Sequence, residues 1–414
     1  MKNSILKYIL KRKDGFFSFF FFGMVSLAIT WPLAYHPGGF LLPQKYNSVS
    51  DILHSDTLEH LAHLGLAREK FLYHENFFVF DFADVAQTYI FFGIATYFFG
   101  ISVNVSHNLY FIISVFLSGY CMYFLCKEIL KDEAASLWGG FLYMSSSYVF
   151  SEYVYGHSNL WQIQWIPLIF LFLEKFLRSP RYVFSFLLGI AIALQVFSST
   201  QYTIYMSFVA CLYVIFRVAI NPKTISFQNI WKKIVLLCVV LFALAGTFIL
   251  QKIALHPNVA VGIFSYQGWS VNSFFEFFDP AKNIFFGYAI FVPIIVGSFF
   301  IFQRNQRRDF GFLYIFSIMF FIFIFLMFGP ASVFYPYTWL YWGWPFFQYI
   351  RTPYRFFPFA LMCIGIISSL FLSKIRTSFS KQQFFFVVFA LIMFTLLLRL
   401  LFSPWFFGRH ILYL

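Results

Sequence analysis

The sequence predicts an all-α, polytopic integral membrane protein with about 11 transmembrane helices in a single domain. Three observations lead to this class. Hydrophobic residues make up 61% of the 414 residues and charged residues only 11%, whereas a soluble domain has about 45–50% apolar and about 25% charged residues. Aromatic residues reach 25%, more than a soluble core could bury without leaving large apolar patches exposed. The apolar residues also gather in runs long enough to cross a bilayer.

Eleven apolar segments are predicted to form these helices. A spanning helix needs about 20 mainly apolar residues, because backbone polar groups left unpaired in hydrocarbon cost several kcal/mol. A polar stretch ends each run before the next begins. In chain order, the predicted helices are 16–35, 107–126, 134–153, 160–177, 182–198, 202–216, 234–250, 284–302, 310–328, 357–372 and 384–402.

The first segment and one further segment need separate arguments. The apolar run that follows the basic N-terminus is too long for a signal peptide and has no small-residue cleavage site, which predicts an uncleaved first helix. Residues 89–99 form an apolar run of only about 11 residues before Gly100, which suits an interfacial or re-entrant helix better than a span. Whether the wider segment 87–104 crosses the membrane stays open at this point.

The distribution of charge predicts the orientation. If the N-terminus lies in the cytoplasm, the inner segments hold 20 of the 29 Lys and Arg and six acids, a net charge of +14. The outer segments and the last helix then hold nine basic and ten acidic residues, a net charge of −1. This is the positive-inside pattern, so the basic excess predicts topology and gives no reason to expect nucleic acid as a partner. The C-terminus is expected outside.

Three predicted outer loops are long enough to carry a function: 36–106, 252–283 and 329–356. No linker divides the chain, so residues 1–414 are predicted to form one transmembrane domain, with no soluble C-terminal domain. The five cysteines all lie in predicted helices without metal-binding spacing, which predicts packing roles and no disulfide framework.

The first outer loop carries acids and histidines on a predicted amphipathic helix. Asp56, Glu59, His60 and His63 are spaced i, i+3, i+4 and i+7, which places them on one helical face. Such a cluster can take a proton from a hydroxyl or bind a divalent cation, with Asp56 and His60 as ligands if a metal is bound. We therefore predict catalytic roles for Asp56, Glu59 and His60. The alternative is a capping box on the polar face of an interfacial helix.

A polar turn between the third and fourth predicted helices is the second candidate. Gly156 permits a close bend, and His157, Asn159 and Gln164 lie next to a wholly apolar helix. Polar groups at the mouth of a membrane helix usually face a cavity, because facing lipid costs free energy. His157 is predicted to contact a substrate oxygen, with Asn159 and Gln164 as hydrogen-bond partners. The alternative is a polar turn at headgroup level, anchored by neighbouring tryptophans.

Two arginines before the tenth predicted helix form the third candidate. Arg351 and Arg355 are four residues apart, and Pro353 fixes the bend between them. Their planar forks of donors can bind the phosphate or diphosphate of a lipid substrate. The alternative is that both side chains extend to ordinary lipid phosphates. Gln201, in the turn between the fifth and sixth predicted helices, is predicted to line the same cavity, with a simple polar turn as its alternative.

Four short runs resemble the pattern of the polytopic GT-C class of glycosyltransferases and of a group of bacterial membrane proteins placed near that class. They are SDTLEHL at 55–61, GHSNLWQIQWIPL at 156–168, SSTQY at 198–202 and RTPYRF at 351–356. The resemblance extends from about residue 10 to about residue 370. Many relatives continue into a soluble outer domain, which is not expected here after the last predicted helix.

The resemblance implies a reaction and a place for it. A sugar, hexose or pentose, would pass from a polyprenyl-phosphate donor to a cell-envelope acceptor on the outer face of the bacterial inner (cytoplasmic) membrane. Asp56 would activate the acceptor or help hold a metal, and Arg351 and Arg355 would stabilise the leaving lipid phosphate. The bilayer and the lipid-linked sugar are the expected partners.

The competing hypothesis is a transporter or flippase of lipid-linked glycans, or a lipid-handling protein without catalysis. Transporters bury ionisable groups near mid-membrane or interrupt paired helices with Gly and Pro. Here the predicted helices are almost free of charge, with Arg399 as the clear exception. No Gly-rich phosphate loop, HExxH or GxSxG motif is present, so ATP-driven work is not expected. Polar groups gather on one side, which favours chemistry at that surface.

Overall fold

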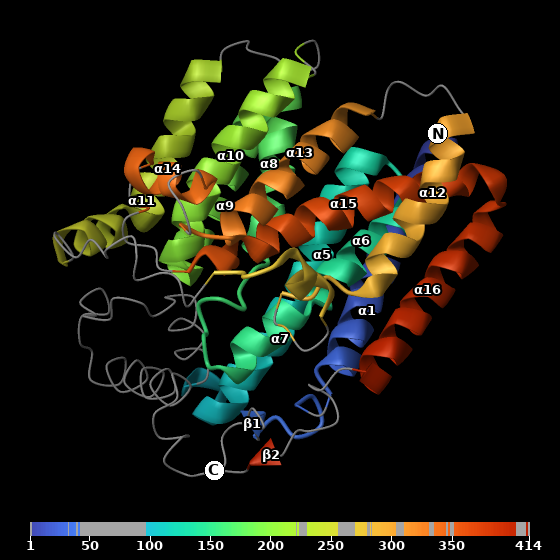
Figure 1. The fold of residues 1–414 in the computed structure, drawn as a ribbon, viewed down its shortest axis with the longest axis horizontal. Coiled ribbons are helices and arrows are strands. Elements are labelled where there is room, and N and C mark those ends of the chain that lie inside the picture. Colours follow the sequence, from blue (N-terminus) through green and yellow to red (C-terminus); the bar gives the residue numbers. More distant parts are fainter. Residues whose placement is uncertain are drawn as a thin grey trace.

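The computed structural model shows an almost entirely helical molecule with one short pair of strands (Figure 1). It describes residues 2–31, 33–38, 40–41, 97–220, 222, 230–255, 270–279, 282, 284–303, 310–330, 335–344, 347, 352–402 and 411–412. Most of the predicted first outer loop, including its amphipathic helix, lies outside these residues, as does most of segment 87–104.

The longer helices follow one another through the whole chain. They are α1 Lys2–Ile29, α5 Val103–Leu130, α6 Glu133–Met144, α7 Ser147–Val154, α8 Trp165–Arg178, α9 Tyr182–Ser198, α10 Thr200–Ile220, α11 Ile230–Leu255, α12 Phe291–Gln303, α13 Phe310–Met327, α14 Pro336–Gly343, α15 Phe357–Ile375 and α16 Lys381–Phe402. Short 3-10 helices are η3 Phe274–Phe278, η4 Tyr288–Ile290, η7 Pro353–Phe356 and η8 Arg376–Ser378. Strands β1 Phe40–Leu41 and β2 Ile411–Leu412 pair antiparallel.

The all-α class is confirmed, and every predicted transmembrane segment overlaps a helix of the structure. Within the described part of the chain, three helices are long and apolar enough to cross a membrane: Val103–Leu130, Thr200–Ile220 and Pro353–Ile375. Shorter apolar helices are Gly15–Ile29, Tyr182–Ser198, Tyr288–Ser298, Gly311–Met327 and Lys381–Leu397. These helices agree with a membrane protein, whereas the number of about 11 spans stays a prediction.

One predicted helix, 134–153, is two helices in the structure. Helix α6 ends at Met144, and α7 begins at Ser147. Ser146 between them has an extended backbone, and its hydroxyl accepts a hydrogen bond from the Tyr148 N–H at 3.2 Å. A serine in this position stabilises a new helix start, because it satisfies an N–H group that has no partner within the helix.

The helix that follows begins later than predicted, at Trp165 instead of residue 160. Pro167 lacks an N–H group and is tolerated only in the first turn of a helix, so the helix cannot extend far towards the N-terminus. Residues 156–164 form a turn in its place. Gly156 adopts a φ of +80°, which favours glycine, and the Gln162 side-chain amide donates to the Ser158 carbonyl at 2.7 Å.

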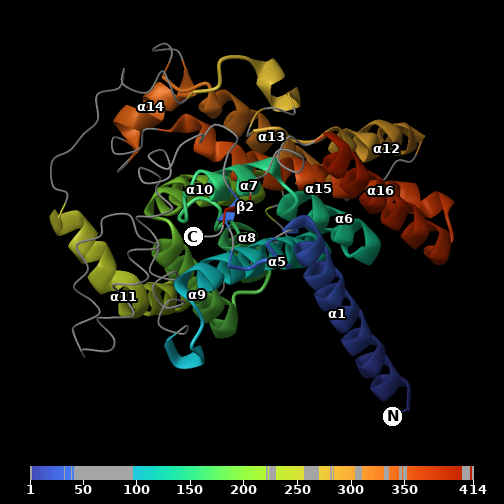
Figure 2. The same ribbon diagram turned by 90° about the horizontal axis from the view of Figure 1, so that it is seen from below.

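Helices α5, α6 and α15 form the centre of the molecule and pack closely. A Cβ atom on Gly140 of α6 would lie 2.6 Å from the carbonyl oxygen of Gly119 of α5. The Trp138 indole N–H donates to the Ser368 hydroxyl at 3.0 Å and connects α6 to α15. Small residues allow membrane helices to approach in this way. Seen from below, α1 and α11 lie on opposite flanks of this centre (Figure 2).

A buried ion pair joins the C-terminal ends of α8 and α10. Arg217 donates to both carboxylate oxygens of Glu174 at 3.0 Å, and Glu174 is fully buried. Tyr213 donates to the same carboxylate at 2.7 Å and Arg178 at 2.5 Å. Along α10, this cluster lies about 24 Å from Gln201, at about 1.5 Å per residue. The predicted outer turns and these charged side chains therefore occupy opposite ends of the same helices.

Candidate functional site

The structure describes only some of the residues that the sequence predicts for the site. Those described are His157, Asn159, Gln164, Gln201 and Arg355. Those outside the described residues are Asp56, Glu59, His60 and Arg351. The predicted catalytic stripe in the first loop therefore remains a prediction, and the site can be built from the second and third candidate regions and from the turn at Gln201.

The turn after α7 folds back over the end of that helix. The His157 N–H donates to the Glu152 carbonyl at 2.9 Å, and the Leu160 N–H donates to the His157 carbonyl at 2.9 Å. Gly156 permits this reversal because its φ of +80° is rarely adopted by residues with a side chain. The turn consequently brings the His157 side chain beside Glu152 of α7.

Glu152 and His157 form a carboxylate–imidazole pair. The Glu152 Oε2 atom lies 2.5 Å from the His157 Nδ1 atom, and the Glu152 side chain is fully buried. The other carboxylate oxygen, Oε1, accepts a hydrogen bond from the Tyr354 hydroxyl at 3.1 Å. An ionised carboxylate can only accept, so the pair places a proton on Nδ1 and makes Nε2 the accepting nitrogen of the neutral ring.

The arginine region meets the same cluster from the N-terminal end of α15. The Arg355 Nη1 group donates to the side-chain oxygen of Gln201 at the start of α10. Tyr354, its neighbour, contacts Glu152, and the Arg355 charge interacts with Glu152 through space without forming a direct ion pair. The structure thus brings His157, Gln201 and Arg355 together, although they are far apart in the sequence.

Tyrosines support the cluster from below. The Tyr148 and Tyr202 hydroxyls lie 2.6 Å apart, and the Tyr202 hydroxyl also donates to the Leu160 carbonyl at 3.0 Å. The Tyr205 hydroxyl donates to the Thr352 carbonyl at 2.9 Å and holds the segment before Arg355 against α10. Because Tyr148, Tyr202 and Tyr205 are fully buried, these bonds fix the relative positions of α7, α10 and η7.

The two remaining described residues lie apart from Arg355. Gln164 is fully buried, and its side-chain oxygen accepts from the Ser114 hydroxyl of α5 at 2.6 Å. Asn159 is half-buried in the same turn as His157. The structure therefore places Gln164 in the contact between the turn and α5, while Asn159 stays next to the carboxylate–imidazole pair.

Several buried donors around the turn and η7 have no hydrogen-bond partner among the described residues. They are the Arg355 Nε–H, the Thr352 and Ser158 hydroxyls, the Trp161 indole N–H and the Gln164 amide nitrogen. A buried polar group without a partner costs about 1–3 kcal/mol. Donors of this kind next to a guanidinium suit the oxygen-rich groups of a phosphate or a sugar.

The described residues alone do not form a metal site. No group of three or more His, Cys, Asp or Glu side chains that could hold a metal ion occurs among them. Glu152 and His157 supply one carboxylate and one imidazole, and the predicted ligands Asp56 and His60 lie outside the described part of the chain. A divalent cation would thus require ligands from the first outer loop.

Glu152 and Tyr354 are the members of the cluster that sequence reasoning did not select. Glu152 was placed at the end of a predicted helix and Tyr354 was one aromatic among many. One signal could have identified Glu152: an ionisable residue within an apolar membrane segment is rarely tolerated without a partner or a function. No comparable signal exists for Tyr354, because 26 tyrosines are spread over the chain.

Comparison with known proteins defines the class of the fold. No protein-family model matches the chain, and no curated protein sequence matches it. Among solved structures, the chain resembles arabinofuranosyltransferase AftD from mycobacteria, with a TM-score of 0.57 and 11% identity over 92% of this chain. A mutant of AftD gives a TM-score of 0.55 and 12% identity over 92% of this chain.

The chain spans about a quarter of the length of these neighbours, 26% and 27%. The similarity shows the fold, and it confirms at that level the predicted resemblance to the GT-C class. The apolar helices and this fold together define a membrane protein with the architecture of a membrane glycosyltransferase.

Proposed function

We propose that the chain is a membrane glycosyltransferase that transfers a sugar from a polyprenyl-phosphate donor to a cell-envelope acceptor on the outer face of the bacterial cytoplasmic membrane. One observation carries this proposal: His157 with Glu152, and Arg355 with Gln201, meet at one end of the helix bundle. An imidazole and a guanidinium are there combined with buried donors that have no partner among the described residues.

The proposed reaction exchanges one bond at the anomeric carbon of the sugar. The acceptor hydroxyl oxygen forms a bond to that carbon, and the bond from the carbon to the lipid-phosphate oxygen breaks. The electron pair leaves on the phosphate, where Arg355, and Arg351 by prediction, stabilise the growing negative charge. The hydroxyl proton passes to a carboxylate, which we assign to Asp56.

His157 has a binding role in this proposal. Held by Glu152 at 2.5 Å, its ring has a fixed orientation, so it can contact a substrate oxygen without losing much side-chain entropy. Gln201 orients Arg355, and Asn159 and Gln164 complete the polar turn. Glu59 and His60 are proposed to act with Asp56 in the first loop. No step depends on a metal, because its ligand set would come from that loop.

The competing function is movement of lipid-linked glycans without a covalent change. The observation in its favour is Gln195 in α9, which is fully buried with no hydrogen-bond partner among the described residues for either polar atom of its side chain. A polar group inside a membrane helix often marks a substrate path. Mass spectrometry of the lipid product separates the two functions, since only transfer produces a free polyprenyl phosphate.

The test uses the purified protein in proteoliposomes with pentosyl and hexosyl polyprenyl-phosphate donors, because the solved neighbour is an arabinofuranosyltransferase. Removing one donor to a developing oxyanion lowers kcat by about 100- to 1,000-fold, so Arg355→Gln is expected to lose transfer to that extent. Asp56→Asn is expected to abolish it. Arg181→Gln is the control, since Arg181 is exposed at the start of α9, at the opposite end of the bundle.

Two outcomes contradict the proposal. Transfer at the wild-type rate by both the Asp56 and the Arg355 variants would remove these residues from the reaction. Movement of a fluorescent lipid-linked sugar across the bilayer, with no sugar leaving its phosphate, would identify the protein as a transporter.

A further inference from the structure

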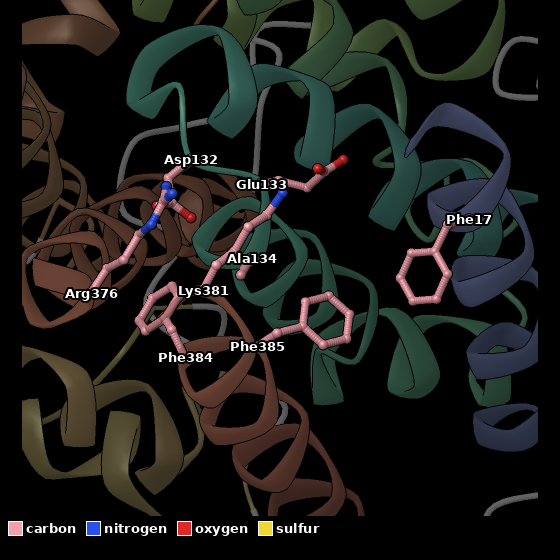
Figure 3. Close-up of a pocket in the computed structure, with 8 residues that line it drawn as sticks. All are labelled: Phe17, Asp132, Glu133, Ala134, Arg376, Lys381, Phe384 and Phe385. Carbon is pink, nitrogen blue, oxygen red and sulfur yellow. The ribbon is translucent and has the colours of Figure 1, made fainter. Parts of the chain in front are cut away.

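A cavity lies at the end of the molecule opposite to the candidate site. Its volume is about 260 Å³, and α1, α6, η8 and α16 supply its walls (Figure 3). The lining residues are Phe17, Asp132, Glu133, Ala134, Arg376, Lys381, Phe384 and Phe385. Arg376 follows the C-terminal end of α15 and Arg355 precedes its N-terminal end, so the two lie about 30 Å apart at about 1.5 Å per residue.

Both acids of the cavity already have a cationic partner. Asp132 contacts Arg376 at 2.6 Å and caps α6 by accepting from the Ala135 N–H at 3.0 Å. Glu133 contacts Lys127 at 3.0 Å. Lys381 is exposed and has no ion pair or hydrogen bond of its ammonium group within the described chain, and Figure 3 shows it reaching from α16 towards the start of α6. The unpaired positive charge favours an anion.

Aromatic rings form the other side of the cavity. Phe17 of α1 and Phe385 of α16 have ring centroids 5.6 Å apart, and they are 47% and 38% exposed. Phe384 is buried beneath them at 1%. Exposed aromatic surface on both helices continues from this point, at Phe20 and Phe389. A ligand that reaches the cation from this side must therefore tolerate contact with apolar rings.

The size of the cavity limits the ligand. Sites for drug-sized molecules and cofactors occupy about 300–1,000 Å³, so this cavity is too small for a lipid-linked sugar. It can hold a compact anionic group whose attached chains leave along the exposed rings. We propose that the cavity binds the phosphate of an anionic glycerophospholipid, with Lys381 contacting the phosphate and Phe17 and Phe385 contacting the acyl chains.

The bound lipid has a structural role in this proposal. Helix α16 packs on α6, and Phe385 connects it to Phe17 of α1. A phospholipid in the cavity contacts all three helices at once and stabilises the position of α16. This inference does not depend on the proposed sugar transfer, because the two sites lie at opposite ends of α15.

The test measures binding of phosphatidylglycerol to the detergent-purified full chain by native mass spectrometry and by the shift of the thermal midpoint. A basic residue near an anionic lipid surface contributes about 1 kcal/mol, so Lys381→Gln is expected to weaken binding about fivefold. Lys381→Arg keeps the charge and is expected to bind within about twofold of the wild type. Lys232→Gln is the matched control: it removes an exposed charge on the same predicted side and leaves binding unchanged.

The comparison ligands decide the source of the phosphate. Phosphatidylcholine, which has no net charge, is expected to bind at least about fivefold more weakly than phosphatidylglycerol. Equal weakening by Lys381→Gln and Lys232→Gln would mean unspecific attraction to the lipid and would overturn the proposal. Saturable binding of inorganic phosphate that displaces the lipid fully would also overturn it, since the site would then recognise a free anion.

Discussion

Glu152 shows how a single side chain can change the interpretation of a predicted site. The sequence predicts His157 from a polar turn, and the structure adds the buried carboxylate that holds its ring. Burying a carboxylate is unfavourable unless hydrogen bonds compensate, and Glu152 has His157 and Tyr354 as partners. Sequence reasoning could not find this contact, because a turn with a glycine in a left-handed conformation creates it.

We expect Glu152→Gln to lower the rate of sugar transfer by about 10- to 100-fold, the usual effect of removing a partner that orients a functional histidine. The amide keeps the size of the side chain but no longer supplies a carboxylate to Nδ1. Transfer kinetics in proteoliposomes measure kcat and KM separately. Glu276→Gln is the control, since Glu276 lies in η3 away from the cluster. A Glu152→Gln protein with wild-type kinetics would show that His157 does not need the carboxylate.

At the scale of helices, the sequence predicted positions well and interruptions poorly. Helix α9 has the predicted bounds, 182–198, because a polar segment ends the apolar run on each side. The break at Ser146 was missed, since serine is common in membrane helices and its capping role depends on the local backbone. The late start of α8 follows from Pro167, whose effect on a helix start could have been inferred from the sequence.

The ion pair between α8 and α10 gives a test at this scale. Glu174→Leu leaves Arg217 buried without its carboxylate, and breaking a buried pair in this way costs about 3–5 kcal/mol of unfolding free energy. The double variant Glu174→Leu/Arg217→Leu is expected to recover most of that loss, because neither charge remains buried. Chemical unfolding in detergent measures both. Glu133→Gln, at the more exposed pair with Lys127, is expected to cost at most about 1 kcal/mol.

Recovery in the double variant is the decisive observation. If the double variant is as unstable as Glu174→Leu, the carboxylate acts through Tyr213 and Arg178 and not mainly through Arg217.

The contact of α5 with α6 provides a second test. Gly140→Ala is expected to lower the unfolding free energy by about 1–3 kcal/mol, because the added Cβ would meet a backbone oxygen of α5 at 2.6 Å, which cannot move aside. Gly23→Ala in α1 is the matched control: no atom lies within 4 Å of its added Cβ, so stability is expected to stay equal or rise by up to about 1 kcal/mol. Equal effects of both changes would contradict close packing at Gly140.

For the whole molecule, the separation of polar groups agrees with the predicted orientation. Basic residues predicted for the cytoplasmic side, such as Arg178 and Arg217, gather at one end of the helices. His157 and Arg355, predicted for the outer side, gather at the other end. The charge count along the sequence was sufficient for this division, because the positive-inside rule acts on short loops.

Cysteine labelling in intact cells tests the orientation. Asn272→Cys, at an exposed position in the predicted outer loop 252–283, is expected to react with an impermeant maleimide from outside. Arg181→Cys, exposed at the start of α9, is expected to react only after the membrane is permeabilised. The wild-type protein, with its five cysteines, gives the background signal. The reverse pattern would place the candidate site in the cytoplasm.

The short pairing of β1 with β2 has a topological consequence. Phe40 lies opposite Leu412, and Leu41 lies opposite Ile411, so the two segments share one side of any membrane that the chain crosses. The chain between them must then cross an even number of times. Ten predicted helices after the first satisfy this parity, whereas an additional crossing by segment 87–104 would violate it. If those ten all cross, the parity requires that segment to return to the side from which it entered.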